Sequence, residues 1–140
     1  MVEAQSIARI LGLPASIHTY AQLESEVSKG LPKRSLERLV SRLIHDRPAV
    51  KMYCYKVVPK ATYNRRGERL NVAGSERTSR IARVLALAEY VWRDKEDARA
   101  WRGTPLPELQ GRARADAART ELGALQVEEI LNKLLFGLPV

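Results

Sequence analysis

A short basic stretch between Val58 and Leu70 contains side chains whose types and spacing suit recognition of nucleic acid. Pro59 favours the first turn of a helix, because the missing N–H of proline has no partner there, and Gly67 marks its end. Arginine can pair with guanine and asparagine with adenine, while neighbouring cations bind phosphates. The pattern predicts a short recognition helix just past a turn. Its candidate DNA-contacting residues are Lys60, Thr62, Tyr63, Asn64, Arg65 and Arg66.

The distribution of charge supports a polyanionic partner. The chain carries a net charge of +8, with 13 basic against 6 acidic residues in 1–74 and 11 against 10 in 75–140. From Arg47 to Arg69, seven basic residues are opposed only by Glu68. Cations that neutralise phosphates release condensed counterions, so a local excess of this size favours nucleic acid. A solvated cationic surface without a partner remains the alternative.

The sequence offers no convincing catalytic or metal-binding constellation. Its single cysteine, Cys54, excludes an internal disulfide, and with only His18 and His45 beside it there is no metal-ligand spacing. A nucleophilic pair of Cys54 and His45 would be nine residues apart without a third member, so we interpret Cys54 as inert. We expect no enzyme activity, no metal and no cofactor.

Length and composition favour one compact, helix-rich domain. The chain has 140 residues, of which 45% are hydrophobic and 29% charged. No apolar run is long enough to span a membrane, and Glu3, Gln5 and Arg9 interrupt the segment where a secretion signal would need a continuous apolar stretch. We therefore expect a cytoplasmic protein without membrane contact.

Capping signals divide the amino-terminal half into helices. One helix is expected from Val2 to Leu11, and a capping box of Thr19 and Gln22 predicts another that runs to Lys29. Ser35 is the predicted cap of a helix over residues 35–45, which would support the recognition helix together with residues 47–55. Residues 47–55 read as helix or strand, and a proline at the first turn favours the helix.

Two longer helices are expected in the carboxy-terminal half. Ser75 is the predicted cap of a central core helix, and Thr120 that of a last helix over Glu121–Leu135. Asp94 is the expected cap of a segment between them. The residues expected to face the core are Ile81, Val84, Leu85, Ala88, Val91 and Trp92 in the first helix and Leu122, Leu125, Ile130, Leu131 and Leu134 in the last.

The last five residues, Phe136 to Val140, have no charged side chain. A free carboxyl terminus usually frays and is polar, so an apolar one needs a cover. Either the domain folds this tail over itself or a partner protein binds it, and the residues alone favour neither.

Several short motifs carry a resemblance to a known family. The segments "ARVLALAEYVW", "ARAW", "TPLPEL", "TELGA" and "LLFG" occur in the order and near the spacing of the carboxy-terminal, toxin-binding domain of Xre-type antitoxins from bacterial RES–Xre toxin–antitoxin systems. The segments "GLPKRSLERLVSRL" and "VPKATYNRR" resemble that family's helix-turn-helix region. The resemblance covers roughly residues 28–137, although Val57 stands where the family often has glycine in the turn.

The resemblance implies a DNA-binding antitoxin that sequesters a RES-domain toxin, an enzyme that degrades NAD. The complex would repress its own operon by binding operator DNA. Because a single short recognition helix rarely gives adequate affinity, we expect a homodimer or a toxin–antitoxin hetero-oligomer. In that family the last helix and tail are thought to block the active site of the toxin. The positions that would take this role here are Asn132, Leu135, Phe136, Gly137, Leu138, Pro139 and Val140.

Taken together, the sequence predicts an all-α protein in two parts. Residues 1–74 would form a helix-turn-helix DNA-binding region and residues 75–140 a small helical toxin-binding domain. The alternative is a solitary helix-turn-helix transcriptional regulator whose carboxy-terminal domain dimerises.

Overall fold

A computed structural model of the protein describes residues 2–44, 46–65, 67–92 and 114–135, and over these ranges every regular element is a helix. The prediction of an all-α fold is therefore confirmed. The helices are α1 (Ala4–Ile10), α2 (Tyr20–Lys29), α3 (Lys33–Leu43), α4 (Arg47–Val57), α5 (Lys60–Arg65), α6 (Val72–Trp92), α8 (Arg114–Ala117) and α9 (Glu121–Leu135). In the part of the chain that is described, no helix has both the length and the apolar character needed to cross a bilayer.

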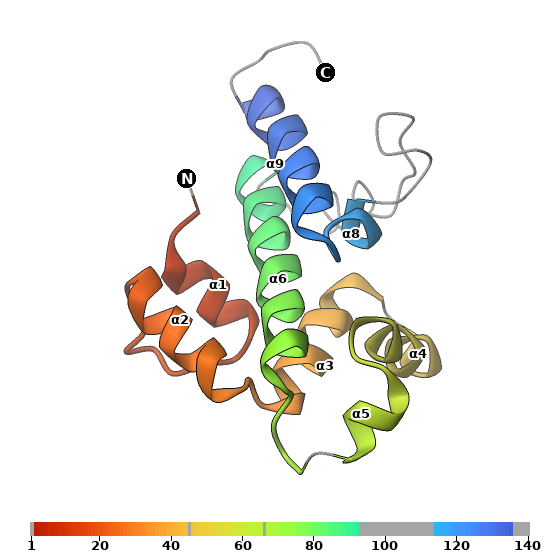
Figure 1. Ribbon diagram of the computed structural model, residues 1–140. Helices are drawn as coiled ribbons and strands as arrows, with labels where there is room; N and C mark the ends of the chain where they lie inside the picture. The colour runs from red at the N-terminus through yellow and green to blue at the C-terminus, as the bar shows by residue number, and fades with distance from the viewer. Residues whose placement is uncertain (1, 45, 66, 93–113, 136–140) are drawn as a thin grey trace.

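Helix α6 is the centre of the molecule (Figure 1). It contacts α1, α2, α3, α4, α8 and α9, and Ile81 and Leu85 on it are almost completely buried. Buried side chains from both halves of the sequence, from Ala4 to Leu131, form one hydrophobic cluster. The predicted division after residue 74 falls inside the first turn of α6, so both proposed parts share a helix and a core.

Local signals placed several helix ends correctly. Thr19 and Gln22 form the predicted capping box at the start of α2, and Gly30 ends that helix with a φ of 89°. Residues 47–55, which could have been a strand, lie in α4, where Pro48 occupies the first turn and Asp46 accepts a hydrogen bond from the Ala49 amide. These caps depend on residues three or four positions apart, which is why the sequence alone reveals them.

The predicted caps Ser35 and Ser75 are wrong. Helix α3 begins at Lys33 and α6 at Val72, so both serines lie inside their helices and are buried. The Ser35 hydroxyl donates to the Leu11 carbonyl at 2.7 Å, and the Ser75 hydroxyl accepts from the Leu31 amide at 2.7 Å. Each hydroxyl forms a hydrogen bond with a buried backbone group far away in the sequence. Without that partner, the buried backbone group would cost free energy. The amino terminus of α6 is capped instead by Asn71, whose side-chain oxygen accepts from the Gly74 amide.

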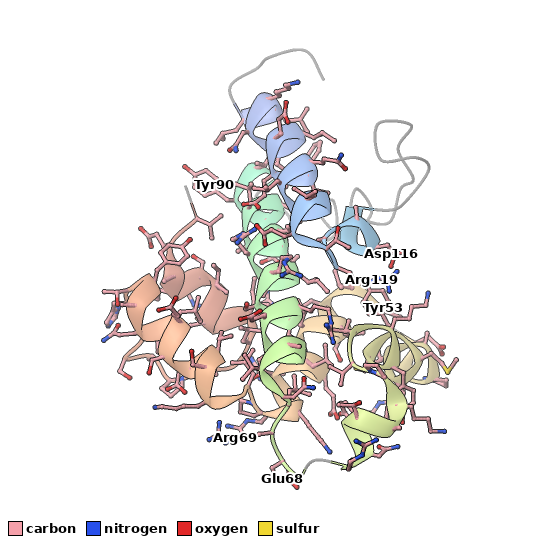
Figure 2. All side chains as sticks on the ribbon, in the orientation of Figure 1. Tyr53, Glu68, Arg69, Tyr90, Asp116 and Arg119 are labelled. Atoms are coloured by element: carbon pink, nitrogen blue, oxygen red, sulfur yellow. The ribbon has the colours of Figure 1, made fainter. Side chains whose placement is uncertain are left out.

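The loop after α5 is fixed to the linker before α3 by a short antiparallel contact. The Lys33 amide donates to the Glu68 carbonyl at 2.9 Å, and the Leu70 amide donates to the Leu31 carbonyl at 2.8 Å. The Arg69 guanidinium, labelled in Figure 2, donates to the Gly30 carbonyl at 2.7 Å. A Cβ on Gly30 would lie 2.5 Å from the Leu70 carbonyl oxygen. Only glycine therefore fits at residue 30, both for its positive φ and for this close approach.

We expect Gly30→Ala to destabilise the protein by about 2–3 kcal/mol, because a positive φ is strained for alanine and the new methyl group meets backbone atoms. Chemical denaturation followed by circular dichroism measures the free energy of unfolding. Gly67→Ala is the matched control in the same loop, since a Cβ there meets nothing within 4 Å. Equal stability of Gly30→Ala and Gly67→Ala would contradict this account of the loop.

Candidate functional site

A helix lies where the recognition helix was predicted: α5 is six residues long, and a turn of only Val58 and Pro59 separates it from α4. The Val58 amide donates to the Cys54 carbonyl at the end of α4, and the Tyr63 amide donates to the Pro59 carbonyl at the start of α5. Val58 is buried and packs against Gly74 of α6. The turn is therefore held against the core, and the contact between the loop after α5 and the linker before α3 holds the other end of the helix.

Tyr63 does not lie on the exposed face of α5. Its side chain is only 4% exposed, and its hydroxyl donates to Glu37 Oε1 on α3 at 2.6 Å. The ring of Tyr55 on α4 meets it edge-on, with centroids 5.8 Å apart. Burial and the hydrogen bond to Glu37 raise the pKa of Tyr63 far above its usual value. Tyr63 thus anchors α5 to α3 and α4, and its side chain is not free to reach a base edge.

The other candidate DNA-contacting residues of α5 are brought together toward solvent. Lys60, Asn64 and Arg65 are exposed, and Thr62 is half-buried. Arg66 lies outside the described residues. The exposed set therefore keeps one arginine and one asparagine, the two side chains best suited to guanine and adenine.

Two lysines outside α5 join this surface. Lys51 belongs to the basic stretch from Arg47 to Arg69 that favours nucleic acid, whereas Lys33 was not predicted to belong to it. The ammonium groups of Lys33 on α3 and Lys51 on α4 lie 4.8 Å and 5.1 Å from the centroid of the Tyr63 ring. Lys60 lies 5.7 Å from the centroid of the Tyr55 ring. In the sequence, Lys33 and Glu37 are four residues apart, which places both on one side of a helix. This spacing was the only feature of the sequence that pointed to the position of Lys33.

On the opposite side of α4, Tyr53 is buried toward α8. Figure 2 shows it beside Asp116 and Arg119, and burial together with Asp116 raises the pKa of Tyr53 far above its usual value. The two aromatic residues of α4 therefore have different surroundings, since Tyr55 packs beside α5 and Tyr53 faces the segment before α9.

Helix α9 is fastened to α6 by a group of partly exposed ion pairs. Arg83 Nη2 lies 2.8 Å from Glu128 Oε1, and Arg80 Nε lies 2.9 Å from Glu121 Oε2. Burial opposes ionisation of Glu121, but the hydrogen bond from Arg80 and the charge of Arg83 outweigh it and lower the pKa of Glu121. The predicted cap Thr120 is confirmed, because its hydroxyl oxygen accepts from the Gly123 amide at 3.0 Å. A Cβ on Gly123 would lie 1.9 Å from the Ala117 carbonyl oxygen, so this glycine makes a close packing contact between α8 and α9.

The face that α9 turns to the core differs from the prediction at two leucines. Ile130 and Leu131 are buried as expected, but Leu122 is 74% exposed and Leu125 is 50% exposed. The physical reason is the packing of α9 against α6 and α8, which buries Gly123, Ala124 and Val127 instead. Leu122 and Leu125 thus form an exposed leucine pair near the start of α9.

An open groove lies beside the end of α9, where the candidate toxin-facing residues Asn132 and Leu135 are found. The groove has a volume of about 670 Å³. Its lining comes from the amino-terminal segment, α2, α6 and α9, and consists of Val2, Tyr20, Arg83, Leu87, Glu128, Asn132 and Leu135. Asn132 is exposed and Leu135 is 36% exposed. The remaining candidates, Phe136, Gly137, Leu138, Pro139 and Val140, lie outside the described residues, as does the expected cap Asp94.

The only cysteine has no reactive environment. Cys54 is buried under α3, and burial raises the pKa of its thiol to about 11, so the uncharged thiol prevails near neutral pH. His45, the histidine considered as its partner, lies outside the described residues. Within the described ranges, no three histidine, cysteine or acidic side chains are grouped in a way that could hold a metal ion.

Comparison with known proteins adds one finding. Residues 87–137 match the family described as the antitoxin Xre/MbcA/ParS C-terminal toxin-binding domain. The match begins inside α6, includes all of α9 and spans less than half of the chain. No curated protein matched the sequence. The matched segment supports an antitoxin role with a toxin as the partner, and it contains Leu87, Glu128, Asn132 and Leu135 of the groove.

Proposed function

We propose that this protein is a non-enzymatic antitoxin that binds and neutralises a RES-type, NAD-degrading toxin and represses its own operon by binding DNA. The observation that carries the antitoxin role is the match of residues 87–137 to a toxin-binding domain. The RES-type toxin is supported by the order and spacing of the sequence motifs that resemble RES–Xre antitoxins. Such a protein would act in the cytoplasm, where operon DNA and NAD are present.

The proposed toxin-binding surface comprises the end of α9 and the tail that follows it. Asn132 and Leu135 border the groove described above, and the apolar residues 136–140 come directly after them. Apolar side chains suit an interface whose centre is desolvated when the partner binds. In this proposal the tail enters or covers the active site of the toxin.

The proposed DNA-binding surface is the exposed face of α5. Lys60, Asn64 and Arg65 project from a short helix whose two ends are tied to the core, so they need little ordering when DNA binds. Figure 1 shows α5 near the beginning of α6 and the end of α9 near the other end of that helix. This separation supports a protein that uses two surfaces for two different partners.

A solitary regulator is the second candidate, and the exposed pair Leu122 and Leu125 favours it, because two adjacent leucines on a helix suit a dimer interface. A neighbouring reading frame for a RES-domain protein distinguishes the two. Its presence supports the antitoxin, and its absence favours the regulator.

Deleting residues 136–140 should abolish neutralisation while leaving DNA binding intact. The deletion removes the apolar tail but none of the side chains of α5. The measurement is growth and cellular NAD during co-expression with the neighbouring RES-domain protein, together with binding of a labelled operator duplex. Undiminished neutralisation by the truncated protein would exclude the tail as the blocking element.

Arg65→Ala should have the converse effect, with weaker operator binding and normal neutralisation. If Arg65 contacts a phosphate, the slope of log K against log salt should become shallower by about 0.9, and if it contacts a base, affinity should fall by about 1–3 kcal/mol. Arg9→Ala, which removes an exposed arginine from α1, is the matched control. If Arg65→Ala and Arg9→Ala bind the operator with equal affinity at every salt concentration, α5 is not part of the DNA interface.

A further inference from the structure

We propose that Lys33, Lys51 and Lys60 form a phosphate clamp that binds the sugar–phosphate backbone of duplex DNA. The clamp is organised by Tyr55 and Tyr63, whose rings meet edge-on. The inference rests on the DNA binding proposed above and extends the contact surface from α5 to α3 and α4.

The three lysines come from three different helices and meet at one aromatic pair. Lys33 and Lys51 lie 4.8 Å and 5.1 Å from the centroid of Tyr63, and Lys60 lies 5.7 Å from that of Tyr55. Such distances are within the range of cation–π attraction, which holds an ammonium group over a ring. The aromatic pair therefore restricts where these flexible side chains extend.

The aromatic pair is itself firmly placed. Tyr63 is buried, and its hydroxyl donates a hydrogen bond to Glu37 at 2.6 Å. The ring of Tyr55 meets the ring of Tyr63 edge-on, at an interplanar angle of 80°. The packing of this pair involves α3, α4 and α5, and each of these helices carries one of the lysines. The fold therefore fixes the relative positions of the lysines. A site with positions fixed in this way needs little reorganisation when an anion binds.

The cluster carries more positive than negative charge. The ammonium groups of Lys33 and Lys51 are each close to one ring centroid, so they are separated by at most the sum of those distances, about 10 Å. Glu37 is the acid found beside them, with Oε1 at 3.8 Å from Lys51, and the same oxygen also accepts the Tyr63 hydrogen bond. One carboxylate cannot neutralise three lysines. A bound phosphate would relieve the remaining repulsion.

Duplex DNA fits this charge better than a small anion or a protein partner does. Lysine binds phosphate as a point charge, without the planar geometry that arginine requires. Lys60 belongs both to the cluster and to the exposed face of α5, so the two surfaces are continuous. Recognition helices need flanking phosphate contacts to fix their register on the duplex. The lysines of α3 and α4 supply such contacts beside the base-reading positions.

The decisive experiment compares the salt dependence of DNA binding for the wild type and Lys33→Gln/Lys51→Gln. The probe is a fluorescein-labelled duplex of mixed sequence, and anisotropy gives the affinity between about 50 and 200 mM salt. The double variant should lower the magnitude of the slope of log K against log salt by about 1.8, close to 0.9 for each lost phosphate contact. Thermal unfolding followed by circular dichroism verifies that the variant is folded.

Two controls separate a clamp from a diffuse basic surface. Lys56→Gln removes a lysine from α4 whose ammonium group lies over Tyr53 on the other side of that helix. Arg9→Gln/Lys133→Gln removes the charge of the exposed Arg9 on α1 and that of Lys133 on α9, which is partly exposed and paired with Glu129. Both controls should keep the wild-type slope.

The outcomes distinguish this inference from the function on which it rests. If the folded double variant keeps the wild-type slope, or if the controls lose as much slope as it does, the clamp is overturned while DNA binding by the protein stands. If the wild type binds neither this duplex nor its operator, both the clamp and the proposed DNA binding are overturned.

Discussion

The burial of α6 among six other helices is the constraint on which the rest of the structure depends. Most side chains of α6 between Ile81 and Ala88 are buried, so neighbouring helices must cover this part of it. Burying apolar area of this kind is the main favourable contribution to folding. Because α6 is continuous from Val72 to Trp92, whatever packs on its beginning and whatever packs on its end belong to one folded unit.

The two candidate surfaces differ in how they are held on that unit. The candidate DNA-binding helix α5 is fixed indirectly, through a buried tyrosine, a two-residue turn and backbone hydrogen bonds to the linker before α3. Helix α9 lies directly on α6 and is joined to it by ion pairs from Arg80 and Arg83, while Gly123 of α9 makes its close contact with α8. Exposed ion pairs contribute little to stability, so the apolar contact is the main attachment and the charges chiefly favour one orientation.

The sequence predicted the features whose causes are local. The all-α fold and the caps at Thr19 and Thr120 follow from patterns that span three or four residues. Ser35 and Ser75 were misread, because their hydrogen-bond partners lie 24 and 44 residues away and no local pattern announces them. Tyr63 was misplaced for the same reason, since its acceptor is on another helix. Residue type thus located the candidate DNA surface, but only the packing of α3, α4 and α5 showed which of its side chains are free.

In the proposed function, one shared core carries a DNA-binding surface and a toxin-binding surface toward opposite ends of α6, so that both can be occupied together. The direct test is the mass of the species formed when the protein is mixed with its operator duplex and the neighbouring RES-domain protein. Size-exclusion chromatography with light scattering should find one species that contains all three components. Displacement of DNA by the toxin, or binding of neither partner, would contradict the account.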